Sequence, residues 1–300
     1  MQGGNQVTAS DLVELDPDHP GFRDAAYRAR RNAIARVAME YREADPVPAV
    51  EYTEDEQGVW RTVWEHLAPL HERYACREYR ECSALVALDR ERIPQLADVN
   101  RILARTTGFA MKPVAGLVSD RTFLGHLGRG IFLATQYIRH ASRPLYTPEP
   151  DVVHELVGHA ATFCHSRFAR LNRLFGKAAA DATGGGGRPE HTEEERALPA
   201  TGGGRRPEHT ADRLARISRL YWYTLEFGVC REGAGLKVCG AGLLSSFGEL
   251  GRFETQAELR AFDPDAIAST PYDPTDYQKL LFVADSFDEL CGRTAAYLLR

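Results

Sequence analysis

The chain has 300 residues, of which 43% are hydrophobic, and its formal net charge is −5. A chain of this size and composition can bury one sizeable core. The negative charge gives no electrostatic basis for binding nucleic acid or an anionic membrane surface. No apolar run approaches the roughly 20 residues that a membrane-spanning helix needs.

The first 18 residues are polar and rich in Gly and Asp, which predicts a flexible tail over 1–18. This segment has neither the basic start nor the apolar stretch of a signal peptide. The six cysteines of the chain form no CxxC pair, a pattern typical of reduced and mostly buried thiols. We therefore expect a cytoplasmic protein with a single domain over 19–300.

The N-terminal part is predicted to be helical. Alanine and arginine with spaced apolar residues predict an amphipathic helix over 22–43. Thr53 followed by Glu56 has the spacing of a capping box that opens a second helix. Further helices are expected at 76–90 and 94–106, the latter starting at a proline suited to a first turn.

Shorter elements follow. The segment 113–118 is β-branched and bounded by turn formers, which predicts a brief strand or an extended loop. A short helix is expected over 121–127. Residues 131–140 are apolar except at their end, where Arg139 and His140 stand.

A glycine-rich tandem repeat interrupts the chain over 183–210. It contains Gly-Gly-Gly-Gly-Arg-Pro-Glu-His-Thr and then Gly-Gly-Gly-Arg-Arg-Pro-Glu-His-Thr, two near-copies with charges but almost no apolar residue. Burial therefore cannot offset the entropy lost on ordering such a segment. We predict a disordered surface insertion within one domain.

The C-terminal part is predicted to mix helix and strand. Apolar residues at helical spacing indicate a helix from 214 to 225. Residues 238–244 predict a strand or hairpin whose glycines allow close backbone approach. Residues 282–287 predict a strand, followed by a helix near the end of the chain. The fold class expected is mostly α with a few short β-strands.

Two histidines stand at a predicted helix start, in His154-Glu-Leu-Val-Gly-His159. On a regular α-helix, residues five apart are separated by about 140°. The pair therefore does not share one face, as the histidines of an HExxH zinc-peptidase helix do. The two rings can still meet at one ion if the first lies at the helix start and the second points inward. The alternative is that both are ordinary core or surface histidines.

Glu226 is the only charged residue between Tyr221 and Cys230. A carboxylate in so apolar a stretch is costly unless it is paired or binds a metal. A salt bridge to Arg219 or Arg231 is one explanation. The other is a metal site, since two neutral imidazoles and one carboxylate form the facial set that suits ferrous iron and leaves positions open for oxygen chemistry.

Several motifs occur in the order found in one enzyme family. They are Thr135-Gln-Tyr-Ile-Arg-His140, Tyr146-Thr-Pro-Glu-Pro-Asp151, His154-Glu-Leu-Val-Gly-His159, Tyr221-Trp-Tyr-Thr-Leu-Glu-Phe-Gly228 and Gly240-Ala-Gly-Leu-Leu-Ser-Ser246. Through them the chain resembles the catalytic domain of the pterin-dependent aromatic amino acid hydroxylases, over nearly its whole length apart from the tail and the insertion. The resemblance implies that family's fold. It also implies a monooxygenase that uses Fe(II), a tetrahydropterin and O2 to hydroxylate an aromatic amino acid.

The resemblance implies a role for each candidate site residue. The iron ligands would be His154, His159 and Glu226. The substrate-binding residues would be Arg139 for the carboxylate, Thr147 and Ser245 for the amino acid backbone, and Pro150, Trp222 and Phe227 for the ring. The pterin-binding residues would be Phe123 by stacking, with Val118, Leu124 and Glu155 beside it. Taken singly, each residue also has an ordinary explanation as a core aromatic, a helix-end cation or part of a loop.

A few positions bear on the substrate. Trp222 is similar to the phenylalanine and tyrosine branches of the family, whereas the tryptophan branch tends to have Phe there. Pro274 stands where tyrosine hydroxylases have an acidic residue, which favours phenylalanine and its para-hydroxylation to tyrosine. Leu133 replaces the usual pterin-side His, and Cys239 replaces a residue that is usually aromatic. These departures keep open meta-hydroxylation in a biosynthetic pathway, and hydroxylation of tryptophan or tyrosine.

Two alternatives from other classes remain, a zinc hydrolase and a non-catalytic metal-binding protein. The regulatory domain and the C-terminal tetramer helix of the animal enzymes have no counterpart in the sequence. We therefore expect a monomer or weak dimer that acts on a small amino acid, with no nucleic acid or membrane partner.

Overall fold

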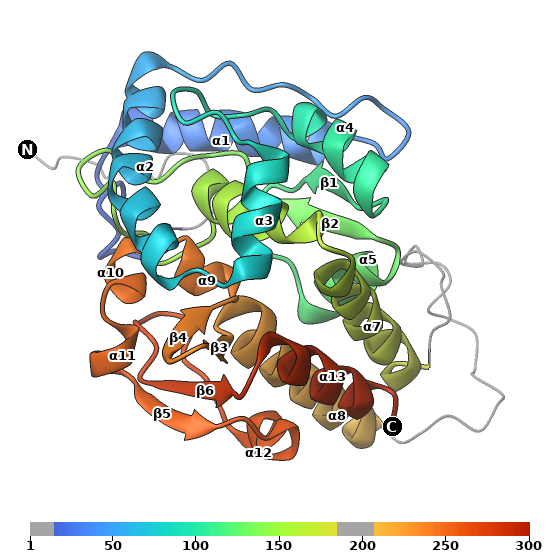
Figure 1. The fold of residues 1–300 in the computed structure, drawn as a ribbon. Coiled ribbons are helices and arrows are strands. Elements are labelled where there is room, and N and C mark those ends of the chain that lie inside the picture. Colours follow the sequence, from blue (N-terminus) through green and yellow to red (C-terminus); the bar gives the residue numbers. More distant parts are fainter. Residues whose placement is uncertain (1–14, 185–206) are drawn as a thin grey trace, which may run out of the picture.

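The computed structural model describes residues 15–184 and 207–300. Over these ranges the chain is mainly helical, with two small sheets (Figure 1). None of the helices found there is both long and apolar enough to cross a membrane. The tail predicted over 1–18 and the insertion predicted over 183–210 lie mostly outside the described residues. Residues 207–210, at the end of the predicted insertion, belong to helix α8.

Helices dominate the N-terminal third. They are α1 (Ala25–Glu40), α2 (Glu54–Tyr74), α3 (Arg77–Val86) and α4 (Leu96–Thr106). The predicted capping box is present: the Thr53 hydroxyl accepts from the backbone N–H of Glu56, and the Glu56 carboxylate accepts from the backbone N–H of Thr53. Helix α4 begins after Pro94, because Gln95 takes the extended N-cap conformation. All four predicted helices are thus confirmed; α1, α3 and α4 are shorter than expected, and α2 extends to Tyr74.

Strands β1 (Ala110–Pro113) and β2 (Ile131–Ala134) form a parallel pair, joined by helix α5 (Asp120–Gly128). The helix expected over 121–127 is therefore confirmed. The segment 113–118 was expected to be a strand or an extended loop, and beyond Pro113 it is a loop.

Helix α5 packs on helix α7 (Ser166–Ala182) through a pair of glycines. A Cβ added to Gly176 would lie 2.0 Å from the backbone N of Gly128 and 2.5 Å from the carbonyl O of Leu124. No side chain fits at such distances, so the two backbones touch directly. This contact sets the position of α5 and of its residue Phe123.

The second sheet has four strands in the order β4–β3–β6–β5. Its strands are β3 (Val229–Glu232), β4 (Gly235–Val238), β5 (Glu258–Ala261) and β6 (Leu280–Ala284). Strands β3 and β4 form an antiparallel hairpin, and β6 runs parallel to both β3 and β5. The helices of this part are α8 (Pro207–Tyr221), α9 (Ala241–Leu244), α10 (Phe247–Leu250), α11 (Phe253–Gln256), α12 (Pro264–Ser269) and α13 (Phe287–Leu298).

The C-terminal predictions are confirmed except for one. Helix α8, strand β6 and helix α13 occur where they were expected. The strand or hairpin expected over 238–244 is wrong after Val238, because residues 241–244 form helix α9. All four residues of α9 are buried. The segment therefore has no polar face, and its short apolar run does not distinguish helix from strand.

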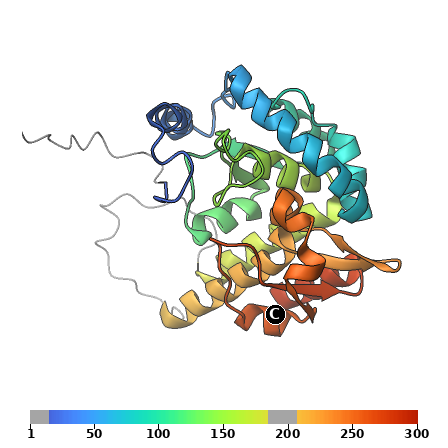
Figure 2. The same cartoon turned by 90° about the vertical axis from the view of Figure 1, so that its left-hand side faces the viewer.

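In space, the middle segment of the chain lies largely between the N-terminal helices and the C-terminal elements. Figures 1 and 2 show most of the blue and cyan N-terminal helices and the orange and red C-terminal elements on opposite sides of the green and yellow middle segment, with α2 also contacting α10 directly. One hydrophobic core joins the three parts, with Trp60, Phe163 and Phe282 among its largest buried side chains. All six cysteines are free thiols, and five of them are buried, as the sequence predicted.

Candidate functional site

Two π-helical turns carry the candidate metal ligands. The two histidines lie in η1 (His154–Ala160), which continues into helix α6 (Ala161–Phe163). Glu226 is the last residue of η3 (Trp222–Glu226), which extends helix α8. In a π-turn the backbone hydrogen bonds join residues five apart. His154 and His159 therefore face the same way, and the 140° separation of an α-helix does not apply.

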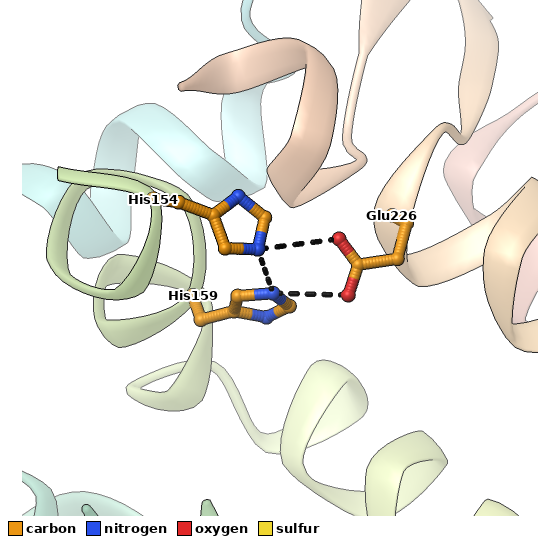
Figure 3. Close-up of side chains that lie close together, drawn as sticks. All are labelled: His154, His159 and Glu226. Atoms are coloured by element: carbon orange, nitrogen blue, oxygen red, sulfur yellow. Dashed lines mark hydrogen bonds and ion pairs between the residues drawn. The ribbon is translucent and has the colours of Figure 1, made fainter. Parts of the chain in front are cut away.

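The three side chains meet, as Figure 3 shows. The Nε2 atoms of His154 and His159 lie 3.1 Å apart. Glu226 Oε1 lies 3.0 Å from Nε2 of His159, and Oε2 lies 3.6 Å from Nε2 of His154. Within residues 15–184 and 207–300, this is the one cluster of three or more His, Cys, Asp or Glu residues arranged to hold a metal ion. Neither flanking arginine forms the salt bridge to Glu226 that was the alternative explanation, since Arg219 donates to the carbonyl of Ala268 and Arg231 pairs with Asp285.

Burial and mutual contact set the charges of this cluster. Burial lowers the pKa of His154 to about 4, so its imidazole is neutral at pH 7. Burial opposes ionisation of Glu226, but the neighbouring His159 and His154 outweigh it and hold the pKa of that carboxyl below its ordinary value. An ionised carboxylate beside two imidazole nitrogens suits ferrous iron. The residues present therefore fit such an ion.

Ser245 and Asp151 orient His154. The Ser245 hydroxyl lies 3.0 Å from Nδ1 of His154 and donates its own proton to the carbonyl of Ala241 at 2.8 Å. Nδ1–H of His154 is thus the donor in that contact, which leaves Nε2 for a metal. Asp151 accepts the backbone N–H of His154 at 3.2 Å. Ser245 also lines the pocket, where the family resemblance implies that it orients the amino acid backbone. Its contact with His154 is an additional role.

The backbone of residues 240–242 fits between the two turns that carry the ligands. A Cβ on Gly158 of η1 would lie 2.7 Å from the carbonyl O of Ala241. A Cβ on Gly240 would lie 2.4 Å from the carbonyl O of Glu226. Main chain therefore touches main chain on both sides. Backbone contacts, and not side-chain conformations, thus set the distance between the two turns.

The cluster opens onto a pocket of about 410 Å³. Every residue assigned to the site from the sequence lines this pocket: His154, His159, Glu226, Arg139, Thr147, Pro150, Trp222, Phe227, Ser245, Val118, Phe123, Leu124 and Glu155. The two departures from the family pattern that bear on ligands, Leu133 and Pro274, line it as well. Cys239 does not, and it is fully buried.

Arg139 lies on a loop at the pocket wall and is only 4% exposed. Its Nε and Nη2 donate to the two carboxylate oxygens of Asp151, each at 2.8 Å. This fork fixes the plane of the guanidinium. The hydroxyl of Thr147, further along the chain at the same pocket, is buried and has no hydrogen-bond partner among the described residues. On the same loop, Glu149 pairs with Arg31 of α1, which holds the loop against that helix.

A second wall contains Phe123 and Glu155. The Phe123 ring packs edge-on against Phe132 and Tyr221, with centroids 5.6 and 5.4 Å away. Oε1 of Glu155 accepts from the backbone N–H and the hydroxyl of Thr135, both at 2.9 Å. Burial raises the pKa of Glu155 to about 8.

A third wall is aromatic. The Trp222 ring packs between Phe227, with centroids 4.7 Å apart, and Tyr272, which stacks on it at 4.2 Å and 12°. The indole Nε1–H donates to Oε1 of Gln278 at 2.9 Å. On the helix that leads to Trp222, the Ser218 hydroxyl is buried at the pocket without a partner in the part of the chain described.

Sequence reasoning missed several residues that support the site. They are Thr135, Asp151, Ser218, Tyr272 and Gln278. Asp151 and Thr135 stood within quoted motifs, so a search for partners of the buried Arg139 and Glu155 could have found them. Nothing in the sequence signals Gln278, because its partners lie far from it along the chain.

The description "biopterin-dependent aromatic amino acid hydroxylase" belongs to the family model that matches residues 3–185 and 208–299. The interruption of the match falls within the predicted insertion. The sequence is 41% identical over 292 residues to tyrosine 3-monooxygenase of Bos taurus, covering 96% of this chain and 54% of that protein. It is 42% identical over 282 residues to phenylalanine-4-hydroxylase of Rattus norvegicus, covering 92% of this chain and 56% of that protein. The chain spans about half the length of these curated relatives.

Solved bacterial structures have the same fold. Phenylalanine hydroxylase of Chromobacterium violaceum, with bound iron(III) and 7,8-dihydrobiopterin, superimposes with a TM-score of 0.70 at 28% identity, covering 88% of this chain and 89% of that chain. The apo structure of the cold-active phenylalanine hydroxylase of Colwellia psychrerythraea 34H gives a TM-score of 0.69 at 26% identity, covering 84% and 88% of the two chains. The predicted catalytic-domain fold, mostly α with few short strands, is confirmed.

Proposed function

This chain belongs to the biopterin-dependent aromatic amino acid hydroxylases, and from that premise we propose that it hydroxylates the ring of L-phenylalanine at the para carbon to give tyrosine. The observation that carries the proposal is the meeting of His154, His159 and Glu226 at one wall of a pocket. Bound ferrous iron and tetrahydropterin would supply the activation of O2, while the protein supplies binding and orientation. Membership of this family leaves the zinc-hydrolase alternative without support.

The iron would be held by His154, His159 and Glu226. These three donors come from two turns on the same side of the pocket, so they leave the pocket side of the ion open. Ser245 keeps Nε2 of His154 directed at the ion by engaging its other nitrogen.

The amino acid would bind through Arg139 and the aromatic wall. The guanidinium is held in place by Asp151 and faces the pocket, as recognition of a carboxylate requires. The unpartnered Thr147 hydroxyl offers a further hydrogen bond to the amino acid. Pro150, Trp222 and Phe227 give an apolar surface for the ring and exclude water from it.

The pterin would bind at the second wall, beside Val118 and Leu124. The Phe123 ring offers a face for stacking, and Glu155 offers a carboxyl group that Thr135 holds in place through one oxygen. The buried, unpartnered Ser218 hydroxyl fits a ligand with polar substituents. These residues therefore fit the cofactor that gives the family its description.

Two pocket residues bear on the choice of substrate and product. Pro274 is the pocket-lining residue at the position where tyrosine hydroxylases have an acidic residue, and this supports phenylalanine over tyrosine; the acidic residue of this loop that lines the pocket is Asp276, two positions further along. Leu133 places an alkyl group at the pocket where the family usually has an imidazole, which supports meta-hydroxylation as the second candidate outcome.

Reconstitution with ferrous iron under anaerobic conditions tests the proposal. Phenylalanine, tetrahydropterin and air are then added, and the product is separated against ortho-, meta- and para-tyrosine. Tyrosine and tryptophan are tested in parallel. Para-tyrosine supports the proposal, whereas meta-tyrosine moves it to the second candidate. No product from any of the three amino acids contradicts it and favours a non-catalytic metal-binding protein.

We also propose that the protein is a monomer or weak dimer. Sedimentation velocity measures this directly, and a stable tetramer contradicts it.

A further inference from the structure

An exposed loop forms part of the pocket wall. Residues 271–278 contain no helix or strand, and residues 273–276 are exposed to solvent. Even so, Tyr272 and residues 274–278 line the pocket. A loop without a backbone ladder owes its shape to its side-chain contacts and to the scaffold beneath it. The contacts that fix this loop therefore also fix one wall of the pocket.

Gln278 makes four such contacts. Its Oε1 accepts from Nε1–H of Trp222 at 2.9 Å, and its Nε2 donates to the carbonyls of Asp273 and Asp276 at 2.9 and 3.1 Å. Its backbone N–H donates to Oε1 of Glu249 at 2.8 Å. One residue thus closes the loop on itself and ties it to η3 and to α10.

The bond to Trp222 reaches the aromatic wall. Gln278 holds the nitrogen edge of the indole, while Tyr272 from the other end of the same loop stacks on its face. Trp222 and Glu226 are the first and last residues of η3. A shift of the indole therefore changes the position of the ring surface relative to a metal ligand on the same turn.

The loop also contacts the segment that would bind the amino acid backbone. The Tyr277 ring packs edge-on against Tyr146, with centroids 5.5 Å apart. Its hydroxyl approaches Gly248 so closely that a Cβ there would lie 2.1 Å from it. Gln278 is the next residue, so its hydrogen bonds also fix where Tyr277 meets Tyr146.

We infer that Gln278 is a positioning residue that holds Trp222 and the 272–277 loop around the ring of the amino acid and thereby determines the preference between phenylalanine and tyrosine. It acts through Trp222 and the loop, not by touching a reacting atom. The inference rests on the proposed function and adds a specificity-determining residue to it.

Two variants separate the contacts of Gln278. Gln278→Leu removes all three side-chain hydrogen bonds at similar volume. Gln278→Glu keeps an acceptor for Trp222 but loses the donor to the carbonyls of Asp273 and Asp276. Gln256→Leu, at an exposed position of helix α11, is the matched control for the same chemical change away from the pocket.

Steady-state kinetics with the iron-loaded protein give the readout. For Gln278→Leu we expect the KM for phenylalanine to rise about tenfold, the effect of losing one to two hydrogen bonds. The ratio of kcat/KM for phenylalanine to that for tyrosine should move at least about threefold toward unity. The KM for tetrahydropterin should stay within about twofold, since the pterin wall is untouched. Gln278→Glu should fall between wild type and Gln278→Leu.

A merely structural role predicts a different pattern. The inference is overturned if the KM values for amino acid and pterin rise together, or if the phenylalanine-to-tyrosine ratio equals that of wild type. Circular dichroism and iron content check that the variants fold. If Gln278→Leu does not fold, the kinetics of Gln278→Glu test the inference instead. A wild-type protein that turns over neither amino acid overturns the proposed function itself. An active wild type with kinetically identical variants overturns only the role of Gln278.

Discussion

Asp151 receives both arms of the Arg139 guanidinium, with Nε and Nη2 each donating to a different carboxylate oxygen at 2.8 Å. The same carboxylate accepts the backbone N–H of Arg139 and that of His154. The pair is almost fully buried, with side-chain exposures of 4% and 1%. One side chain therefore joins the proposed carboxylate-binding group to the first proposed metal ligand.

Asp151→Asn tests this link. The amide keeps the volume but removes the charge that holds the guanidinium, and an unpaired buried charge costs roughly 3–5 kcal/mol. We expect the KM for the amino acid to rise more than about tenfold and the melting temperature to fall. Asp265→Asn, in the exposed pair with Arg300, is the control and should have almost no effect. An amino acid KM equal to that of wild type would falsify the link.

Loss of a proposed metal ligand should empty the site without unfolding the chain. His159→Ala removes one donor and Glu226→Gln replaces the carboxylate with a neutral, weaker oxygen donor, and the expected drop in iron affinity exceeds the roughly 100-fold that loss of an outer-shell partner costs. Iron per chain after desalting measures this, with His66→Ala on the exposed face of α2 as the control. Iron retained at the wild-type level in both ligand variants is the contrary result.

The glycine contact between α5 and α7 should be sensitive to one methyl group. In Gly176→Ala the added Cβ meets the Gly128 backbone, and overpacking of this kind costs about 1–3 kcal/mol or more. Gly125→Ala, on helix α5 like Gly128, has nothing within 4 Å of its new methyl. It should be neutral or stabilise by up to about 1 kcal/mol. Chemical denaturation compares the two, and equal stability of the two variants contradicts direct backbone contact.

His71 should make stability depend on pH. Its ring is buried beside Trp64 and Tyr79, its Nε2–H donates to the carbonyl of Leu244 at 2.7 Å, and burial lowers its pKa to about 4. Arg90 also disfavours the charged ring. The unfolded chain binds this proton at a pKa of about 6.5. Between about pH 6.5 and 4, the unfolded state therefore holds a proton that the folded state does not.

The free energy of unfolding should consequently fall as pH falls through that window, by up to about 1.4 kcal/mol per pH unit from this group. His71→Gln keeps a donor for the Leu244 carbonyl but cannot titrate. Urea unfolding of the iron-loaded proteins at pH 7.5 and pH 5 should show a smaller loss in the variant. The same loss in both proteins would show that His71 does not contribute.

Much of the fold followed from local chemistry in the sequence. The capping box at Thr53 and Glu56 predicted the start of α2, because both hydrogen bonds form between residues three apart. Helix α9 was wrongly expected to be a strand, because its residues are buried on every side and its conformation is decided by packing. The π-turns η1 and η3 have no sequence period of their own, so the meeting of His154 and His159 depended on a backbone geometry that spacing does not reveal.

The candidate site was predicted as a set of residues but not as a structure. The residues that the family motifs predicted as metal ligands and as ligand-binding residues all line one pocket. The residues that hold them in position come from distant segments: Gln278 binds Trp222 across 56 positions, and Ser245 binds His154 across 91. Such pairs are properties of the folded chain, and no motif contains both partners.

The main-chain contacts at Gly158 and Gly240 have a consequence for metal substitution. Because backbone alone spaces the two ligand-bearing turns, the cavity for the ion has its dimensions before any metal arrives. An incoming ion must then adapt to the protein, whatever coordination it prefers in water. Cobalt(II) in place of iron(II) would bind in a site of the same size. Its visible absorption spectrum would then report the coordination geometry that the protein imposes. A substitute ion can therefore report the shape of the proposed iron site without the oxygen chemistry proposed for iron.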